Sequence, residues 1–144
     1  MTADDFVLQP RARGTSATWR TRAPISTPFG AFEVEIGAEP DSELVASSNL
    51  LAGFVTRNIG DIYEAVYAHY QRACEDAQWM RSCGVPRGLR YDRVAKHVRS
   101  RTISIRRRRD GTVAAAIFLV PEWDTEHGIE LSLHDGRLAP TPSS

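Results

Sequence analysis

The chain has 144 residues, of which 42% are hydrophobic and 25% are charged, as expected of a single globular domain. Its longest apolar run, residues 113–120, is too short to cross a bilayer, and its acidic start differs from the basic start of a secretory signal. We therefore expect a cytoplasmic protein with no membrane partner.

Charge is distributed unevenly along the chain. Eighteen basic and eighteen acidic residues give a net charge of zero. Residues 81–109 contain eleven basic residues and one acid, whereas the remainder contains seven basic residues and seventeen acids. The first part therefore carries +10 and the remainder −10. Such a dipolar chain can steer a charged partner from either side.

The chain divides into three parts. We expect a flexible N-terminal arm over residues 1–16, one α+β domain over residues 17–139 and a loose C-terminal tail over residues 140–144. Within the domain, residues 17–22 favour a short edge strand around a tryptophan. Residues 32–36 alternate between apolar and acidic side chains, which is typical of a half-buried strand.

Three helices are predicted next. The first begins at Asp41 or Ser42 and ends before a C-cap with a left-handed residue in 58–60. The second runs from residue 61 to about residue 79 and carries apolar residues at helical spacing. Residues 91–98 predict a short third helix with basic residues at its C-terminal end, where they complement the helix dipole.

The last third of the sequence predicts strands. Ile103 and Ile105 alternate with polar residues, and Asp110-Gly111 favours a two-residue type I′ hairpin turn. Residues 112–120 are apolar on both faces, which predicts a central strand, and residues 129–133 alternate again before a second Asp-Gly turn. The predicted fold is α+β, in the order β-β-α-α-α-β-β-β, with helices packed on one face of an antiparallel sheet.

The sequence gives no support for nucleophilic catalysis. Cys74 and Cys83 are nine positions apart, a spacing that matches no metal motif, and in a cytoplasmic chain we expect both to be reduced. The sequence has no Gly-x-Ser-x-Gly elbow, no glycine-rich phosphate loop and no cysteine set beside a matching histidine. We therefore expect no catalytic residue, no metal and no cofactor.

The most distinctive string is Trp123-Asp124-Thr125-Glu126-His127-Gly128, followed by an alternating strand and Asp-Gly. Here the chain resembles a family of uncharacterised bacterial domains whose C-terminal hairpin reads Trp-Asp-x-Glu-His-Gly. The resemblance extends over roughly residues 17–138. It implies an α+β domain without an established activity, and it implies relatives among immunity-type proteins encoded beside bacterial toxins.

Two interpretations of this motif are open. Asp124, Glu126 and His127 could form a metal site or an acid-base set, as in a metal-assisted hydrolase. The structural interpretation is simpler: Trp123 packs on the core, Asp124 caps the turn and Gly128 adopts a positive φ, while His127 or Glu126 satisfies a buried backbone group. We favour the structural interpretation, because spacing alone seldom makes a site.

A run of arginines supports a second hypothesis, a nucleic-acid-binding accessory protein. The residues concerned are Arg99, Arg101, Arg106, Arg107, Arg108 and Arg109. They could contact phosphates, but no nucleic-acid motif surrounds them, and Trp79 and Tyr91 are the only local aromatic residues for stacking on bases. A basic edge strand that resists edge-to-edge pairing explains the run equally well, so nucleic acid is not the partner we expect.

Our first hypothesis is a toxin-neutralising protein that occludes a protein partner stoichiometrically. The predicted contact residues are an acidic set and part of the motif: Glu33, Glu35, Glu39, Asp41, Glu43, Asp61, Glu64, Asp124, Glu126 and His127. Complementary charge on a cognate toxin would raise the association rate. Tyr63, Tyr67 and Tyr70 share one helical face and could form a recognition stripe, although aromatic residues at this spacing are more often core.

Overall fold

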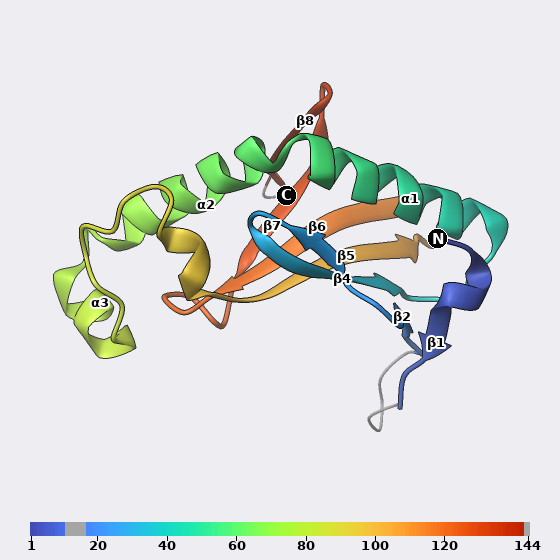
Figure 1. Cartoon of the computed structure of the whole chain (residues 1–144), viewed down its shortest axis with the longest axis horizontal. Coiled ribbons are helices and arrows are strands. Elements are labelled where there is room, and N and C mark those ends of the chain that lie inside the picture. The colour runs from blue at the N-terminus through green and yellow to red at the C-terminus, as the bar shows by residue number, and fades with distance from the viewer. Residues whose placement is uncertain (11–16, 143–144) are drawn as a thin grey trace.

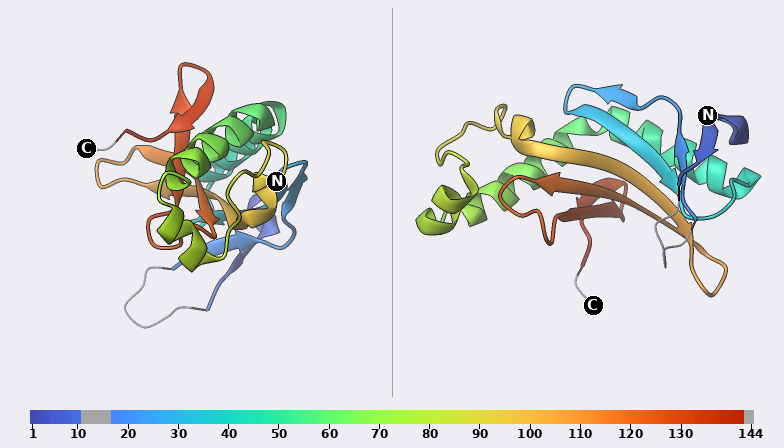
Figure 2. Two further views of the ribbon diagram at one scale, coloured as in Figure 1. Left: turned by 90° about the vertical axis from the view of Figure 1, so that its left-hand side faces the viewer. Right: turned by 90° about the horizontal axis from the view of Figure 1, so that it is seen from below.

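A computed structural model describes residues 1–10 and 17–142 of the chain. Within these residues the chain forms an eight-stranded, mostly antiparallel sheet and three α-helices, and the helices lie on one side of the sheet (Figure 1). The other face is uncovered, and in the view from below the strands lie in front of the helices (Figure 2). The predicted α+β class and element order are confirmed.

The strands follow each other across the sheet in the order β1-β2-β4-β5-β6-β7-β8, and β3 pairs with β4. Their bounds are Phe6–Leu8 (β1), Trp19–Thr21 (β2), Ile25–Thr27 (β3), Gly30–Ile36 (β4), Val98–Arg107 (β5), Val113–Pro121 (β6), Ile129–His134 (β7) and Arg137–Pro140 (β8). The predicted central strand is confirmed, because β6 lies between β5 and β7.

One pair of strands departs from the antiparallel pattern. β4 and β5 are parallel, with Val34 opposite Ile103 and Ile36 opposite Ile105. Parallel neighbours require a long crossover connection, which the three helices provide here. All four of these side chains are buried beneath the helices, which explains why both strands alternate between apolar and polar residues.

The helices differ in part from the predicted ones. α1 spans Ser42–Arg57 and begins as predicted, because the Asp41 carboxylate accepts a hydrogen bond from the Leu44 N–H. α2 spans Ile59–Ala73, so a single residue, Asn58, separates the two helices. The predicted left-handed C-cap is wrong: Gly60 lies inside α2 and has no positive φ.

The third helix lies upstream of its predicted position. α3 spans Ala77–Cys83; the Asp76 carboxylate caps it by accepting from the Trp79 N–H, and Gly84, at φ 72°, ends it. The predicted second helix therefore stops before Asp76 instead of continuing to residue 79. The predicted helix over 91–98 is wrong, because only Val94–His97 is helical there, as a 3₁₀ turn that leads into β5.

The N-terminal residues join the sheet where they are described. β1 pairs with β2, and Phe6 is 4% exposed, so the predicted flexible arm does not describe residues 6–8, and β2 is not the edge strand we expected. Residues 11–16 of that predicted arm lie outside the described residues, as do residues 143–144 of the predicted tail.

The two Asp-Gly turns have different conformations. Asp135 and Gly136 both have positive φ, which a type I′ turn requires, and they join β7 to β8. At the β5–β6 turn only Gly111 has positive φ, and the Arg108 N–H donates to the Thr112 carbonyl. That hairpin has a three-residue loop with a left-handed glycine, so the predicted type I′ turn is wrong there.

Candidate functional site

The Trp123–Gly128 motif forms the loop between β6 and β7. The Trp123 side chain is 1% exposed and packs edge-on against the Tyr70 ring, at a centroid distance of 5.3 Å. Gly128 has φ 66°, and a Cβ built on it would lie 2.9 Å from the Leu119 carbonyl oxygen. The packing of Trp123 and the positive φ of Gly128 agree with the structural interpretation of the motif.

Asp124 organises the loop through its carboxylate. Its Oδ1 accepts a hydrogen bond from the His127 backbone N–H at 3.1 Å, and the same oxygen lies 3.1 Å from Nδ1 of the His127 imidazole. Because a carboxylate only accepts, Nδ1 carries the proton of this hydrogen bond. Within the described residues the His127 imidazole bonds to Asp124 and to no buried backbone group, and its side chain is 82% exposed.

A histidine from α2 completes the network. The indole Nε1–H of Trp123 donates to His69 Nδ1 at 2.9 Å, and the indole can only donate. Neutral His69 must then carry its proton on Nε2, which lies 3.8 Å from Asp124 Oδ2. Burial and the nearby Arg72 lower the pKa of His69, and they outweigh Asp124, which acts in the opposite direction.

These residues line an open cavity of about 350 Å³ between α2, α3 and the loop. Trp79 forms part of its wall and is 48% exposed, yet its indole N–H donates to the Trp123 carbonyl at 2.7 Å. One edge of the Trp79 ring is thus fixed while a large part of the ring faces solvent. Asp76, Arg72 and His127 add charged or polar groups to the same wall.

The predicted acidic surface consists largely of ion pairs. Three arginines each lie between two of the predicted carboxylates: Arg20 between Glu33 and Glu35, Arg107 between Asp41 and Glu43, and Arg137 between Asp61 and Glu64. Each group keeps a net charge of −1. Glu39 is exposed and has no ion pair within residues 1–10 and 17–142. The acidic surface is therefore weaker than the sequence alone indicates.

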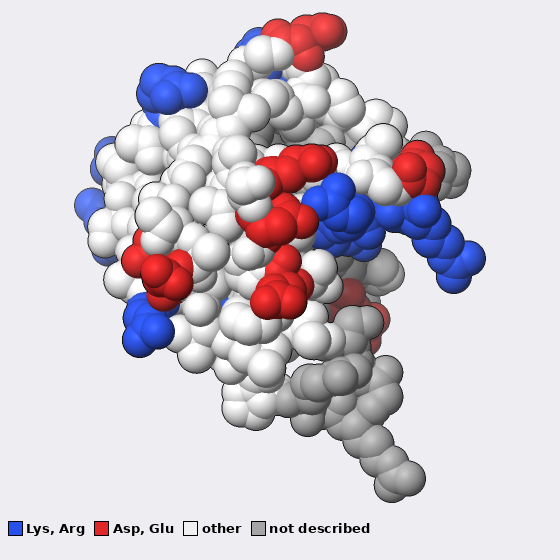
Figure 3. Space-filling view, turned by 90° about the vertical axis from the view of Figure 1, so that its right-hand side faces the viewer, with Lys and Arg blue, Asp and Glu red and all other residues white. Residues whose placement is uncertain are grey.

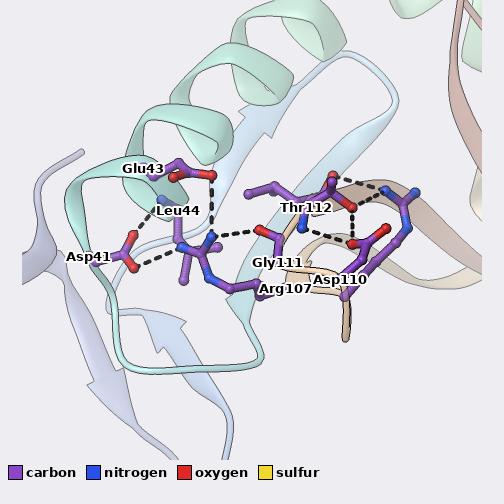
Figure 4. A network of polar contacts seen from close by, with 9 residues as sticks. Asp41, Glu43, Leu44, Arg107, Asp110, Gly111 and Thr112 are labelled. Atoms are coloured by element: carbon purple, nitrogen blue, oxygen red, sulfur yellow. Dashed lines mark hydrogen bonds and ion pairs between the residues drawn. The ribbon is translucent and has the colours of Figure 1, made fainter.

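The Arg107 group joins the start of α1 to the β5–β6 hairpin (Figure 4). Its guanidinium lies 2.9 Å from Asp41 and 3.3 Å from Glu43, and it also donates to the Gly111 carbonyl at 3.0 Å. The Leu44 N–H, and then Arg107, hold the pKa of Asp41 below its usual value. Acidic and basic side chains lie side by side at this end of the molecule (Figure 3).

The fold divides the run of arginines that was considered as a nucleic-acid contact. Arg101 is partly buried with its guanidinium 5.4 Å from the centre of the Phe29 ring, and burial lowers its pKa. Arg107 is held by the two carboxylates, and Arg108 donates to Thr112 Oγ1 within its own hairpin. The remaining three, Arg99, Arg106 and Arg109, are exposed. Successive residues of β5 point to opposite faces, which separates this run.

The tyrosines of α2 pack together at the edge of the core. Tyr70 is buried, as expected for a core position, and Tyr63 and Tyr67 are partly buried and pack against the hydrophobic core. Tyr91 stacks on Tyr63 at a centroid distance of 5.7 Å. This packing supports the core interpretation of the tyrosine stripe.

Nothing in the sequence marks His69 and Arg72 as neighbours of the motif, and Trp79 was predicted only as an aromatic residue for stacking on bases. His69 stands on α2, 54 positions before Trp123, and no local pattern links the two. Glu126 is exposed, and the structure does not bring it to Asp124 as a third ligand. Among the described residues, no three His, Cys, Asp or Glu side chains are grouped so that they could hold a metal ion.

The fold and the loop define a small α+β domain that carries a polar cavity beside an exposed, anchored tryptophan. The chain belongs to the family described as domain of unknown function DUF6985, whose model matches residues 13–140. This agrees with the predicted resemblance to an uncharacterised domain family. Comparisons with curated proteins and with solved structures found no match.

Two smaller findings complete the description. In the described part of the chain, no helix combines the length and the apolarity needed to cross a bilayer. Cys74 and Cys83 are both free and partly buried, at the ends of α2 and α3.

Proposed function

We propose that the chain is a cytoplasmic binding protein of the toxin-neutralising, immunity type. It occludes a protein partner stoichiometrically and performs no chemistry of its own. The partner, a cognate bacterial toxin, contacts the end of the domain formed by α3 and the Trp123–Gly128 loop.

The exposed and anchored Trp79 carries this proposal. Tryptophan is enriched among the residues that dominate binding energy at protein interfaces. A side chain that is already fixed loses little conformational freedom on binding, and the bond from the Trp79 indole to the Trp123 carbonyl fixes this one. With 48% of its surface exposed, the ring keeps a large apolar area for a partner to cover.

The charges around Trp79 indicate a basic partner surface. Asp76 and Asp124 outnumber Arg72, the one arginine that lines the same cavity, and Glu126 is exposed on the same loop. The three arginine-bridged groups elsewhere on the molecule each add one net negative charge to its overall field. Opposite charge on the partner would raise the association rate and make it fall with salt.

The test is rescue from a toxin. If a neighbouring gene encodes a large protein with a variable toxic C-terminal domain, that domain should be co-expressed with this chain. We expect wild type and Leu50→Ala to rescue the cells, because Leu50 is 61% exposed on α1, far along the chain from α3. Trp79→Ala should fail while remaining folded. Absence of rescue by wild type, or full rescue by Trp79→Ala, would contradict the proposal.

A further inference from the structure

The uncovered face of the sheet carries a second, chemically different groove. It has a volume of about 390 Å³ and lies over β5, β6 and β7. Ile103, Ile105 and Ile117 point to the helices and are fully buried, so their strand neighbours point to the open face. The groove is therefore separate from the Trp79 cavity, which lies between helices and a loop.

Phe118 provides an aromatic ring on this face. It is 39% exposed and lines the groove, and its strand neighbours Ile117 and Leu119 are buried on the opposite, helix-covered face. The neighbouring side chains on the floor are small: Ala114, Ala116, Ser104 and Ser132. Small neighbours leave the face of the ring open to a planar group, as on the sheets of single-strand RNA-binding domains.

Arg106 and Arg108 provide positive charge at one end of the groove. Neither has an ion pair in the part of the chain that the structure describes, in contrast to Arg107 between them. Arg106 faces Ala114 across the strands, four positions from Phe118 on β6, or about 13 Å along the strand. An arginine reaches several ångströms, so its guanidinium can meet a phosphate attached to a nucleoside stacked on Phe118.

Glu130 adds a group that can select a base. It lies directly opposite Phe118 in the β6–β7 register and is the one acid among the groove's lining residues. A carboxylate accepts from the exocyclic amino group of cytosine and offers no donor to a uracil or thymine carbonyl. The groove should therefore prefer cytosine over uracil.

From this arrangement we infer that the open sheet face binds single-stranded nucleic acid, one nucleotide of which occupies the groove. Phe118 stacks on the base, Arg106 and Arg108 contact phosphate, and Glu130 accepts from the base amino group. An acidic protein segment would use the two arginines but would leave Phe118 and Glu130 unexplained. The inference is independent of the toxin-binding proposal, because it concerns another face.

The probe is a fluorescein-labelled oligo(dC) twelve-mer. Its binding is measured by fluorescence anisotropy at low salt as the full chain is added. We expect oligo(dC) to bind at least about fivefold more tightly than oligo(dU), because a matched base contact contributes about that factor or more. Glu130→Gln should reduce this ratio toward one. Binding should weaken as salt rises, with a log-log slope near −0.7 for each phosphate contacted.

Variants separate the groove from general arginine attraction. Phe118→Ala should weaken oligo(dC) binding about tenfold, since stacking on one base contributes about five- to 150-fold, and Phe118→Trp should bind as tightly as wild type. Arg106→Ser with Arg108→Ser should lose binding. The charge-matched control, Arg99→Ser with Arg109→Ser, should keep it, because neither of these residues lines the groove. Thermal unfolding shows that each variant is folded.

Four results would overturn the inference. The first is no anisotropy change at low salt, and the second is equal loss in the groove and control double variants. The third is binding of a twelve-residue poly-glutamate that depends on Arg106 and Arg108 while oligo(dC) does not bind, which would indicate an acidic protein segment. Free dCMP that binds as tightly as the oligonucleotide would also contradict a site for a strand.

Discussion

The two ends of the molecule hold polar networks that use similar residue types in different surroundings. At one end Arg107 bridges Asp41 and Glu43 on the surface. At the other end Asp124 contacts His127, and His69 accepts from the buried Trp123. The first network is exposed to solvent, whereas the second is anchored to the core through the buried Trp123 side chain.

This difference shows what burial does to similar chemistry. Surface ion pairs contribute little, because solvent screens them and two long side chains must be ordered. A hydrogen bond from a buried indole must be made, because leaving the donor unpaired costs about 1–3 kcal/mol. We therefore expect the Trp123 network to determine stability and the position of Trp79, and the Arg107 network to shape surface charge.

Trp123→Ala should have the largest effect. It removes a side chain that is 1% exposed, together with its hydrogen bond to His69 and its contact with the Tyr70 ring. Loss of a buried tryptophan costs about 3–5 kcal/mol of unfolding free energy, which urea denaturation can measure. Trp123→Phe keeps most of the packing but not the indole N–H, so it should lose clearly less unfolding free energy than Trp123→Ala. Equal losses in both variants would show that the hydrogen bond matters more than packing.

Gly128→Ala should cause the next largest loss of unfolding free energy. The substitution forces a left-handed alanine and places its Cβ 2.9 Å from the Leu119 carbonyl oxygen. Gly136→Ala is the matched control, because that glycine also has positive φ but has nothing within 4 Å. The control should lose about 1–2 kcal/mol, the cost of the left-handed conformation alone. Gly128→Ala should lose more, and a smaller loss than in the control would contradict this account of the loop.

The dependence of stability on pH should come partly from His69. Its folded pKa lies below the ordinary value of 6.5, so the unfolded chain takes up a proton first as the pH falls. The contribution is complete above pH 6.5 and is lost as the pH falls through the folded pKa. His69→Asn keeps an acceptor for the indole but does not titrate. Unfolding free energies between pH 8 and 5 should fall less in this variant, and an unchanged slope would exclude His69 as a source.

Arg107→Ala should have the smallest effect on stability. The guanidinium and both of its carboxylate partners are largely solvated, so the thermal midpoint should stay close to that of wild type at physiological salt. A midpoint drop comparable to that of Gly128→Ala would show that the comparison between the two ends is wrong.

The sequence predicted the fold where periodicity and caps act locally. The buried alternation of β4 and β5 and the Asp41 cap of α1 were readable directly. The parallel β4–β5 pairing was not, because alternation does not reveal strand direction. α3 was not predicted as a separate helix although Asp76 is an ordinary start signal, since the apolar spacing of α2 continues past Asp76 to Ala77.

The candidate site was predictable only in part, for a similar reason. The motif showed that Trp123 would be buried and that Gly128 would need positive φ. His69 and Trp79 reach the loop from α2 and α3, and such contacts depend on how elements pack, which no single segment encodes. Phe118 was overlooked on the open face because an apolar central strand predicts burial on both sides.

Titration calorimetry of the purified chain with the toxic domain of its gene neighbour would show whether Trp79 is the contact that holds a toxin. We expect one-to-one binding that weakens at least about 30-fold in Trp79→Ala, the loss expected of a hot-spot residue, and is unchanged in Leu50→Ala. Binding by Trp79→Ala at wild-type strength would contradict the proposal, because the partner would then not depend on the anchored ring.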